Sequence, residues 1–191
     1  MFRKPLILAA MLAVAACAPA PRKPAEPAPA PAVEPRPAPP AGVRVSGVEQ
    51  KIIEATNGFR RENRLDPLKP DVSLIVIAQK HARNMARQDK FGDTDKNGHV
   101  LDGKSMGDRI QVGGYEFGRV AENVGYQLNK PDPADSMMQG WKTSPGHRRN
   151  LLLGDVTEIG VGAAQGKSGR WYFVQVFGRP ADPPKVIKIS K

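Results

Sequence analysis

The chain has 191 residues, a formal net charge of +10 and one cysteine, Cys17. A single cysteine excludes an internal disulfide, so the folded part must be held together by its hydrophobic core. The basic residues are interspersed with acidic ones and are not grouped with aromatic side chains. This pattern argues against a nucleic-acid partner and is more compatible with weak attraction to anionic polymers of a cell envelope.

Residues 1–17 are typical of a secretory signal peptide. Arg3 and Lys4 precede an apolar run, residues 6–16, that is too short to span a bilayer comfortably. The small residues before Cys17 resemble a bacterial lipobox, which would make Cys17 the lipidated first residue of the mature protein. Ordinary cleavage that leaves a free thiol is the less favoured alternative. Because several acyl chains on one cysteine anchor a protein stably, we expect a membrane-anchored lipoprotein of the bacterial cell envelope, with its domain outside the cytoplasm.

Residues 18–44 consist largely of alanine and proline with scattered charges. Such a segment has little to bury and favours extended, polyproline-like conformations, so we predict a semi-rigid linker. Residues 45–180 are enough for one ordinary domain, and residues 181–191 form a polar C-terminal tail.

Capping signals mark the helices of the first half of the domain. Ser46 and Glu49 form a capping box at the start of the first helix, and a second helix is expected to begin at Asp71. His81 lies on the apolar stripe of that second helix, which favours a packed core histidine over a ligand. A short helix is expected over residues 106–112, ended by glycines.

The loop after the second helix contains a polar motif and a histidine. Asp93, Asp95 and Asn97 imitate the first half of an EF-hand calcium loop, but Lys104 stands where that loop requires a bidentate glutamate. We therefore predict no calcium site of that type, while an opportunistic weak cation site stays open. His99 lies outside any apolar periodicity, so it is either exposed or functional.

Residues 120–127 are predicted to form a strand that places Glu122 among apolar side chains. A buried carboxylate needs a partner, because desolvating it alone is costly. Two roles stay open for Glu122: an ion pair with Arg109 or Arg119, or a ligand role. Asn123 points to the opposite face of the strand, where it could bond to turn backbone.

The segment from Trp141 to His147 combines a helix end, a turn and an oriented histidine. A helix that begins at Asp132 is expected to bury Trp141 on its packed face. Ser144 is a natural N-cap and Pro145 suits the first position of a new short helix. His147 then falls in the first turn of this helix, which would hold its imidazole in one orientation.

Residues 157–164 and 170–177 are typical of two strands joined in a hairpin. Gly160, Gly162 and Ala164 share one face of the first strand. Because this face lacks large side chains, we expect another layer to approach it closely.

Three residues are difficult to explain by packing: His99, Glu122 and His147. Two imidazoles and a carboxylate could fill three of the four positions that zinc prefers, with the last left for water or a ligand. Their separations match no local ligand motif such as His-Glu-x-x-His. Spacing alone therefore favours a metal site only weakly.

Several sequence blocks, taken together, resemble the bacterial branch of the CAP superfamily, also called SCP-like, which includes cysteine-rich secretory proteins, venom allergens and plant pathogenesis-related proteins. The blocks are His99-Val100-Leu101-Asp102-Gly103-Lys104-Ser105, Asp108-Arg109-Ile110, Gly114-Tyr115, Ala121-Glu122-Asn123-Val124, Trp141-Lys142-Thr143-Ser144-Pro145-Gly146-His147-Arg148-Arg149-Asn150 and Glu158-Ile159-Gly160-Val161-Gly162. The resemblance runs from the first helix to Phe177.

The resemblance implies an α+β fold, a three-layer α-β-α sandwich with helices on both faces of a small, mainly antiparallel sheet. In that family a central cleft carries two histidines and usually two glutamates, with a divalent metal, often zinc, in some members. By motif, His99, Glu122 and His147 take three of these places and Ser144 takes that of the second glutamate. Ser144 and Asn123 are thus further candidate cleft residues.

These observations favour binding over catalysis. We expect a lipid-anchored envelope protein whose cleft binds zinc or another divalent cation, or a small lipid, an envelope polymer or a protein. A metal-dependent hydrolase of peptidase or esterase type is the first alternative, but it would lack an evident general base if Glu122 were a ligand. A structural or adhesive interaction module is the second.

Overall fold

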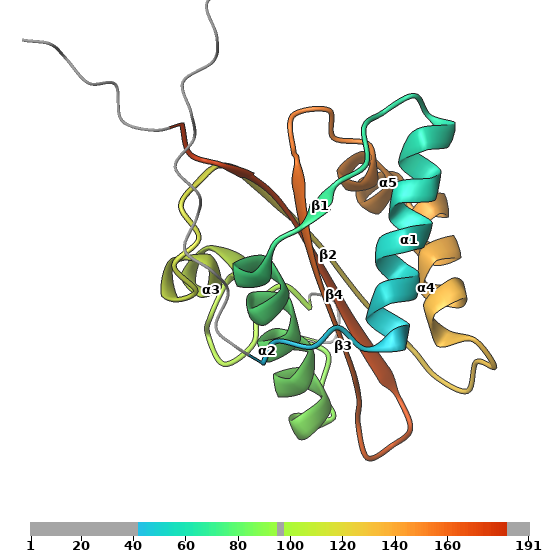
Figure 1. Ribbon diagram of the computed structural model, residues 1–191. Coiled ribbons are helices and arrows are strands. Elements are labelled where there is room, and N and C mark those ends of the chain that lie inside the picture. Colours follow the sequence, from blue (N-terminus) through green and yellow to red (C-terminus); the bar gives the residue numbers. More distant parts are fainter. Residues whose placement is uncertain (1–41, 95–97, 183–191) are drawn as a thin grey trace, which may run out of the picture. The chain divides into compact units, whose positions relative to one another are not determined.

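The computed structural model describes residues 42–94 and 98–182, and its helices and strands follow one another as shown in Figure 1. They are α1 (Gly47–Glu62), β1 (Lys69–Pro70), α2 (Val72–Gln88), α3 (Met106–Val112), β2 (Phe117–Gln127), α4 (Pro133–Thr143), α5 (Pro145–Leu151), β3 (Glu158–Gln165) and β4 (Trp171–Pro180). The predicted signal peptide, Cys17 and nearly all of the linker lie outside the described residues.

Within the described residues, four strands form one sheet in the order β1-β3-β4-β2. β3 and β4 form the predicted hairpin, β4 pairs antiparallel with β2, and the short β1 pairs parallel with β3. The sheet is therefore small and mainly antiparallel, as predicted, and β2 lies at one of its edges. The strand predicted over residues 120–127 starts earlier, at Phe117.

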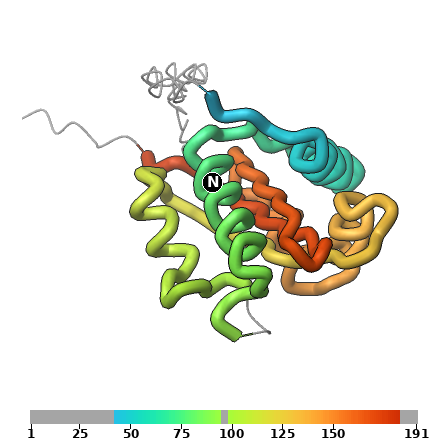
Figure 2. The backbone as a smooth tube through the Cα atoms, turned by 90° about the horizontal axis from the view of Figure 1, so that it is seen from below, coloured from blue at the N-terminus to red at the C-terminus, as the bar shows by residue number. Residues whose placement is uncertain are grey.

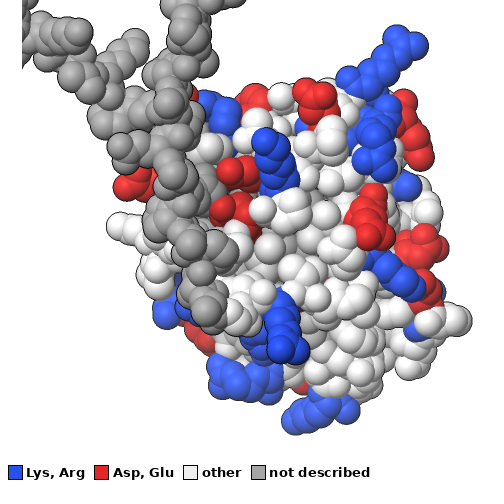
Figure 3. All heavy atoms as spheres, viewed as in Figure 1, with Lys and Arg blue, Asp and Glu red and all other residues white. Residues whose placement is uncertain are grey.

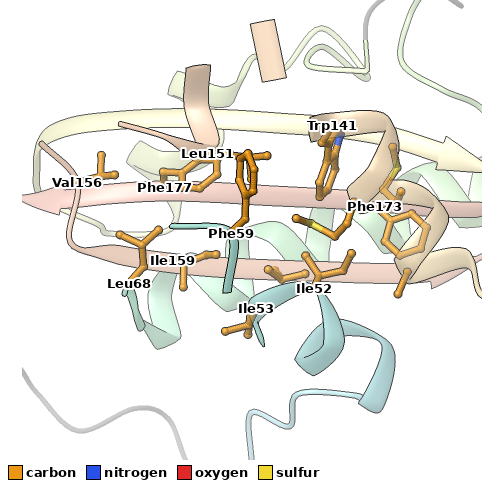
Figure 4. Packing of buried hydrophobic residues seen from close by; sticks show 14 residues of the cluster. Ile52, Ile53, Phe59, Leu68, Trp141, Leu151, Val156, Ile159, Phe173 and Phe177 are labelled. Atoms are coloured by element: carbon orange, nitrogen blue, oxygen red, sulfur yellow. The ribbon is translucent and has the colours of Figure 1, made fainter. Parts of the chain in front are cut away.

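Helices cover both faces of this sheet, and each face has its own hydrophobic core (Figures 1 and 2). On one face, residues of α1, α4 and α5 pack on β3 and β4; Figure 4 shows Phe59 and Trp141 of this core beside Phe173 and Phe177. On the other face, residues of α2 and α3 pack on β2 and β4. The predicted three-layer α-β-α sandwich is confirmed.

The helix starts follow the capping signals of the sequence. Ser46 and Glu49 form both bonds of the predicted capping box, and the Asp71 side chain accepts a hydrogen bond from the backbone of Leu74. Asp132 caps α4 in the same way, with its carboxylate on the first backbone amides of that helix. These bonds satisfy amide groups that have no partner inside the helix, so each helix has a fixed point of entry.

No helix in the described ranges is both long and apolar enough to cross a membrane. On the face shown in Figure 3, Lys and Arg side chains lie beside Asp and Glu side chains. The mixed charge distribution seen in the sequence is thus also found on this surface.

The glycine face of β3 is where α2 packs against the sheet. A Cβ atom built on Gly160 would lie 2.1 Å from the carbonyl carbon of Leu74, and one on Gly162 would lie 2.3 Å from that of Ala78. Both contacts are with helix backbone, which cannot move aside as a flexible side chain would. The predicted close approach is confirmed, and the missing side chains set the distance between α2 and the sheet.

Gly162→Ala is therefore expected to lower the free energy of unfolding by about 3 kcal/mol, because the added methyl group overpacks the interface between α2 and β3. Urea denaturation monitored by circular dichroism measures this loss. Gly154→Ala is the matched control, since a Cβ at Gly154 meets nothing within 4 Å, and its stability should change by about 0.5 kcal/mol or less. Equal stability of the two variants would contradict this packing.

Candidate functional site

Glu122 is the buried acid of the site, and it is held by two partners from other elements. Both of its carboxylate oxygens accept hydrogen bonds from one terminal nitrogen of Arg109, each at 2.8 Å. One of these oxygens also lies 2.9 Å from Nδ1 of His99. Glu122 comes from β2 and Arg109 from α3, so the ion pair joins the edge strand to the helix layer beside it.

The ion pair decides between the partners that the sequence left open. Arg109 binds Glu122, whereas Arg119 lies 3.7 Å from Asp155, with both of those side chains about half exposed. The other terminal nitrogen of Arg109 donates to the backbone carbonyls of His99 and Lys104, at 2.9 and 3.0 Å. One arginine thus fixes the carboxylate and the loop that carries His99.

His99 is half exposed, with 43% of its side chain accessible, and is bonded to Glu122 on its inner side. An ionised carboxylate can only accept hydrogen bonds, so Nδ1 of His99 carries the proton in this contact. A ligand would bind this imidazole through Nε2 and would replace any contact that this nitrogen makes. His99 is thus half exposed to solvent and is held in one orientation by Glu122.

His81 and Asp93 organise the chain on either side of His99. His81 is only 2% exposed and its Nε2 lies 2.7 Å from the carbonyl oxygen of Gly98, which confirms it as a core histidine. The Asp93 carboxylate accepts hydrogen bonds from the backbone of Asp102 and Gly103. In the calcium-loop comparison, Asp95 and Asn97 lie outside the described residues.

His147 lies in the first turn of α5, as predicted, but Ser144 positions it differently from the expectation. The backbone of Ser144 occupies the N-cap position, yet its hydroxyl makes no capping bond to the helix. Instead, the hydroxyl lies 2.9 Å from Nδ1 of His147. The predicted N-cap position of Ser144 is confirmed, but its hydroxyl is engaged by the imidazole three residues later and not by the helix backbone. The Trp141 ring packs behind it, with the ring centroids 6.5 Å apart.

The pKa of His147 is lowered below its ordinary value of 6.5, first by burial and then by the charge of His99. Burial disfavours the charged imidazolium, and a second imidazole nearby adds repulsion when it is protonated. The geometric link is the Asn123 side chain, next to Glu122 in β2, which donates to the backbone carbonyl of His147. At neutral pH the imidazole of His147 is therefore uncharged, and its Nδ1 is held by the hydroxyl of Ser144.

A buried amide network supports this neighbourhood from the other face of β2. The Asn123 side chain donates to the backbone carbonyl of His147 and to Gln175, both at 3.2 Å. The Asn150 side chain donates to Asn123 at 2.9 Å and to the backbone carbonyl of Glu122 at 3.1 Å. Asn123 was expected to bond to turn backbone, but its backbone partner lies in helix α5, and the network fastens this helix to the edge strand.

Sequence reasoning missed Asn150 and Gln175 as members of the site. Asn150 lies three residues after His147 and so on a neighbouring position of the same helix face. Gln175 is fully buried in β4, where it interrupts an otherwise apolar run. A lone amide in a buried strand was the signal that could have identified it, because such a group must find a partner.

A cavity of about 400 Å³ opens beside the ion pair, and its lining includes His99, Glu122 and Asn150 together with Ser105 and Met106 at the start of α3. His147 does not line this cavity. Among residues 42–94 and 98–182, no three His, Cys, Asp or Glu side chains are grouped so that they could hold a metal ion. The structure thus brings His99 and Glu122 into contact and places His147 near them, and the three-ligand metal site stays a prediction.

The sequence of residues 53–177 matches the model of the cysteine-rich secretory protein family, CAP. This chain belongs to the CAP family. Two Bacillus subtilis proteins are similar to it: the uncharacterized membrane protein YlbC, 31% identical over 68% of this chain and 34% of that protein, and the uncharacterized protein YkwD, 29% identical over 71% and 49%. The chain thus spans half or less of the length of these two relatives.

Solved structures with the CAP fold include two bacterial proteins of the cell exterior. An extracellular protein with an SCP domain from Bacillus anthracis superposes with a TM-score of 0.58 at 30% identity, covering 70% of this chain and 40% of that one. An outer surface protein from Borrelia burgdorferi gives 0.62 at 19% identity, with 73% and 97% covered. NaASP2, crystallised with Zn²⁺, gives 0.50 at 14% identity, with 75% and 85% covered.

The lowered pKa of His147 predicts a pH effect with a definite sign. Because the folded state binds this proton less readily than the unfolded state, stability is lost as the pH falls from 6.5 through the lowered pKa. We expect a pH titration by NMR to give His147 a pKa below 6.5. His99→Gln should raise this pKa without restoring 6.5, since burial remains, and Lys167→Gln should leave it unchanged. A pKa at or above 6.5 in the unchanged protein would contradict the described environment.

Proposed function

We propose that this protein is a lipoprotein of the bacterial cell envelope whose CAP domain binds a ligand beside His99, Glu122 and His147. The proposal is supported by family membership, by the similarity to an extracellular Bacillus anthracis protein and to the membrane protein YlbC, and by the lipobox-like sequence before Cys17. The membrane is then a partner through the lipid on Cys17. A small lipid, an envelope polymer or a protein is the candidate ligand besides a metal.

The observation that carries the proposal is the bond between Glu122 and the half-exposed imidazole of His99. A buried ion pair is weak evidence of a stabilising role, because a protein with well-packed apolar residues of the same volume in its place is often equally or more stable. Here the ion pair holds one imidazole in one tautomer at the wall of a cavity. An oriented imidazole at a cavity wall is suited to recognising a ligand.

A divalent cation is the most concrete ligand, and the residues fit it only in part. Glu122 does not fit as a ligand, since its oxygens are taken by Arg109 and His99 and a metal beside Arg109 would face its positive charge. Glu122 does fit the role of the carboxylate that orients a metal-binding histidine through Nδ1. His99 and His147 would then hold the cation through Nε2, and a bound cation would supply a positive centre for an anionic group.

The same contacts favour binding over hydrolysis. A general base must be able to take a proton from water, and the Glu122 carboxylate is engaged by a guanidinium and by the N–H group of an imidazole. Two imidazoles are also fewer protein ligands than the three of catalytic zinc sites. We therefore propose a binding protein in preference to a metal-dependent hydrolase or a purely structural module.

Zinc titration of the purified protein by calorimetry tests the metal form of this proposal. His99→Ala and His147→Ala should abolish binding, whereas Glu122→Gln should weaken it by about 10-fold to 100-fold, as expected for a residue that only orients a ligand. Ser144→Glu should strengthen binding, because it adds a carboxylate beside His147. Lys167→Ala is the control, since Lys167 is exposed in the turn between β3 and β4 and contacts none of these residues, and it should bind zinc unchanged.

The outcomes of this titration separate the roles. Loss of binding in Glu122→Gln as complete as in His147→Ala would make Glu122 a direct ligand. Unchanged binding in both His→Ala variants would contradict a metal site at these residues.

Lipid anchoring is tested separately by Cys17→Ser in the bacterial host. The unchanged protein should fractionate with membranes and the variant should not be acylated, because Cys17 is the single cysteine of the chain. Metabolic labelling with a fatty acid analogue and membrane fractionation measure both effects. Equal labelling of the two proteins would contradict the anchor.

A further inference from the structure

A second cavity, of about 430 Å³, lies between α2 and α3 and shares no lining residue with the cavity at His99. Its apolar wall includes Ile77 and Leu101, which are buried, and Val112, whose residue surface is 84% exposed. An exposed valine next to buried aliphatic side chains continues the apolar wall out to the surface. The cavity therefore offers an apolar interior that opens to solvent.

The rim of this cavity is basic. Lys80, Arg83 and Arg87 follow one another at helical spacing on α2, and Lys104 comes from the loop before α3. Asp102 lies near Arg87, but like charges at the spacing of Lys80 and Arg83 repel one another, and a bound anion would relieve that repulsion. Asp108 is the acidic residue of the lining, and its carboxylate is already engaged by Ser105 in the capping box of α3.

Lys80 and Lys104 are the cations available to a ligand at this rim. Neither ammonium group forms a hydrogen bond or ion pair with any residue that the structure describes, and both residues are exposed. Arg109 also lines the cavity, but its terminal nitrogens are taken by Glu122 and backbone carbonyls. Arg83 donates to Gln79 at 3.4 Å, and Arg87 donates to Asn84.

The volume of the cavity indicates a small-molecule ligand. Its apolar wall and basic rim indicate that this ligand is an amphiphile. Cavities of about 300–1,000 Å³ are typical of small-molecule sites, whereas a stable protein partner needs an interface of roughly 1,000 Å² or more. We propose that the groove between α2 and α3 binds a single-chain organic anion, with the hydrocarbon body on Ile77, Leu101 and Val112 and the carboxylate or phosphate headgroup at Lys80 and Lys104. This site is separate from the one at His99 and goes beyond the proposed function.

Calorimetric titration of the full chain with decanoate, decyl phosphate and uncharged decyl glucoside, each below its critical micelle concentration, tests the site. The two anions should bind at least about tenfold more tightly than the glucoside, because only they pair with the rim, and the tighter of the two identifies the headgroup. Inorganic phosphate should bind more weakly than decyl phosphate, since it lacks the apolar body. Equal binding of anion and glucoside, or of phosphate and decyl phosphate, would overturn the proposal.

Two variants place the ligand in this groove. Lys80→Glu/Lys104→Glu should weaken decyl anion binding about tenfold or more, while Lys69→Glu/Lys167→Glu, with the same charge change at exposed positions outside the groove, should weaken it far less. Val112→Asn, an exposed position whose change should not disturb folding, should weaken all three decyl ligands. Equal loss in the two lysine pairs, or full binding in Val112→Asn, would overturn the assignment to this groove.

Discussion

The contact between Arg109 and Glu122 is the constraint on which the site depends. A carboxylate buried on β2 would be unstable without a cation, and Arg109 supplies one from α3 through bonds to both oxygens. The same guanidinium holds the backbone of the His99 loop. Because Glu122 also fixes Nδ1 of His99, the ion pair sets the position of α3, the loop and the imidazole together.

The position of β2 at the sheet edge explains how groups from both helix layers can meet. Glu122 and Asn123 point to opposite faces of this strand, the first toward Arg109 and the second toward α5. Asn150 reaches from α5 to the backbone carbonyl of Glu122 and so binds the edge strand from outside its pairing with β4. His99 and His147 therefore approach one neighbourhood from opposite faces of the sheet. No single helix or strand could bring these two histidines together.

The sequence predicted the elements and several partners but not the assembly of the site. Caps at Ser46, Asp71 and Asp132 and the glycine face of β3 are local or periodic signals, and the structure follows them. The choice of Arg109 over Arg119 depends on where α3 docks, which short-range spacing does not encode. The Ser144 hydroxyl could bond either the helix backbone or His147, and only the folded turn decides between them.

The most direct test of this account is a double-mutant cycle on Arg109 and Glu122, measured by urea denaturation. Arg109→Met should lower the free energy of unfolding by about 3–5 kcal/mol, because it leaves a buried carboxylate without its cation. The double variant Arg109→Met/Glu122→Gln should be more stable than Arg109→Met, because no buried charge is then left without a partner. The sum of the losses in the two single variants should therefore exceed the loss in the double variant. Additive losses would contradict the central role of the ion pair.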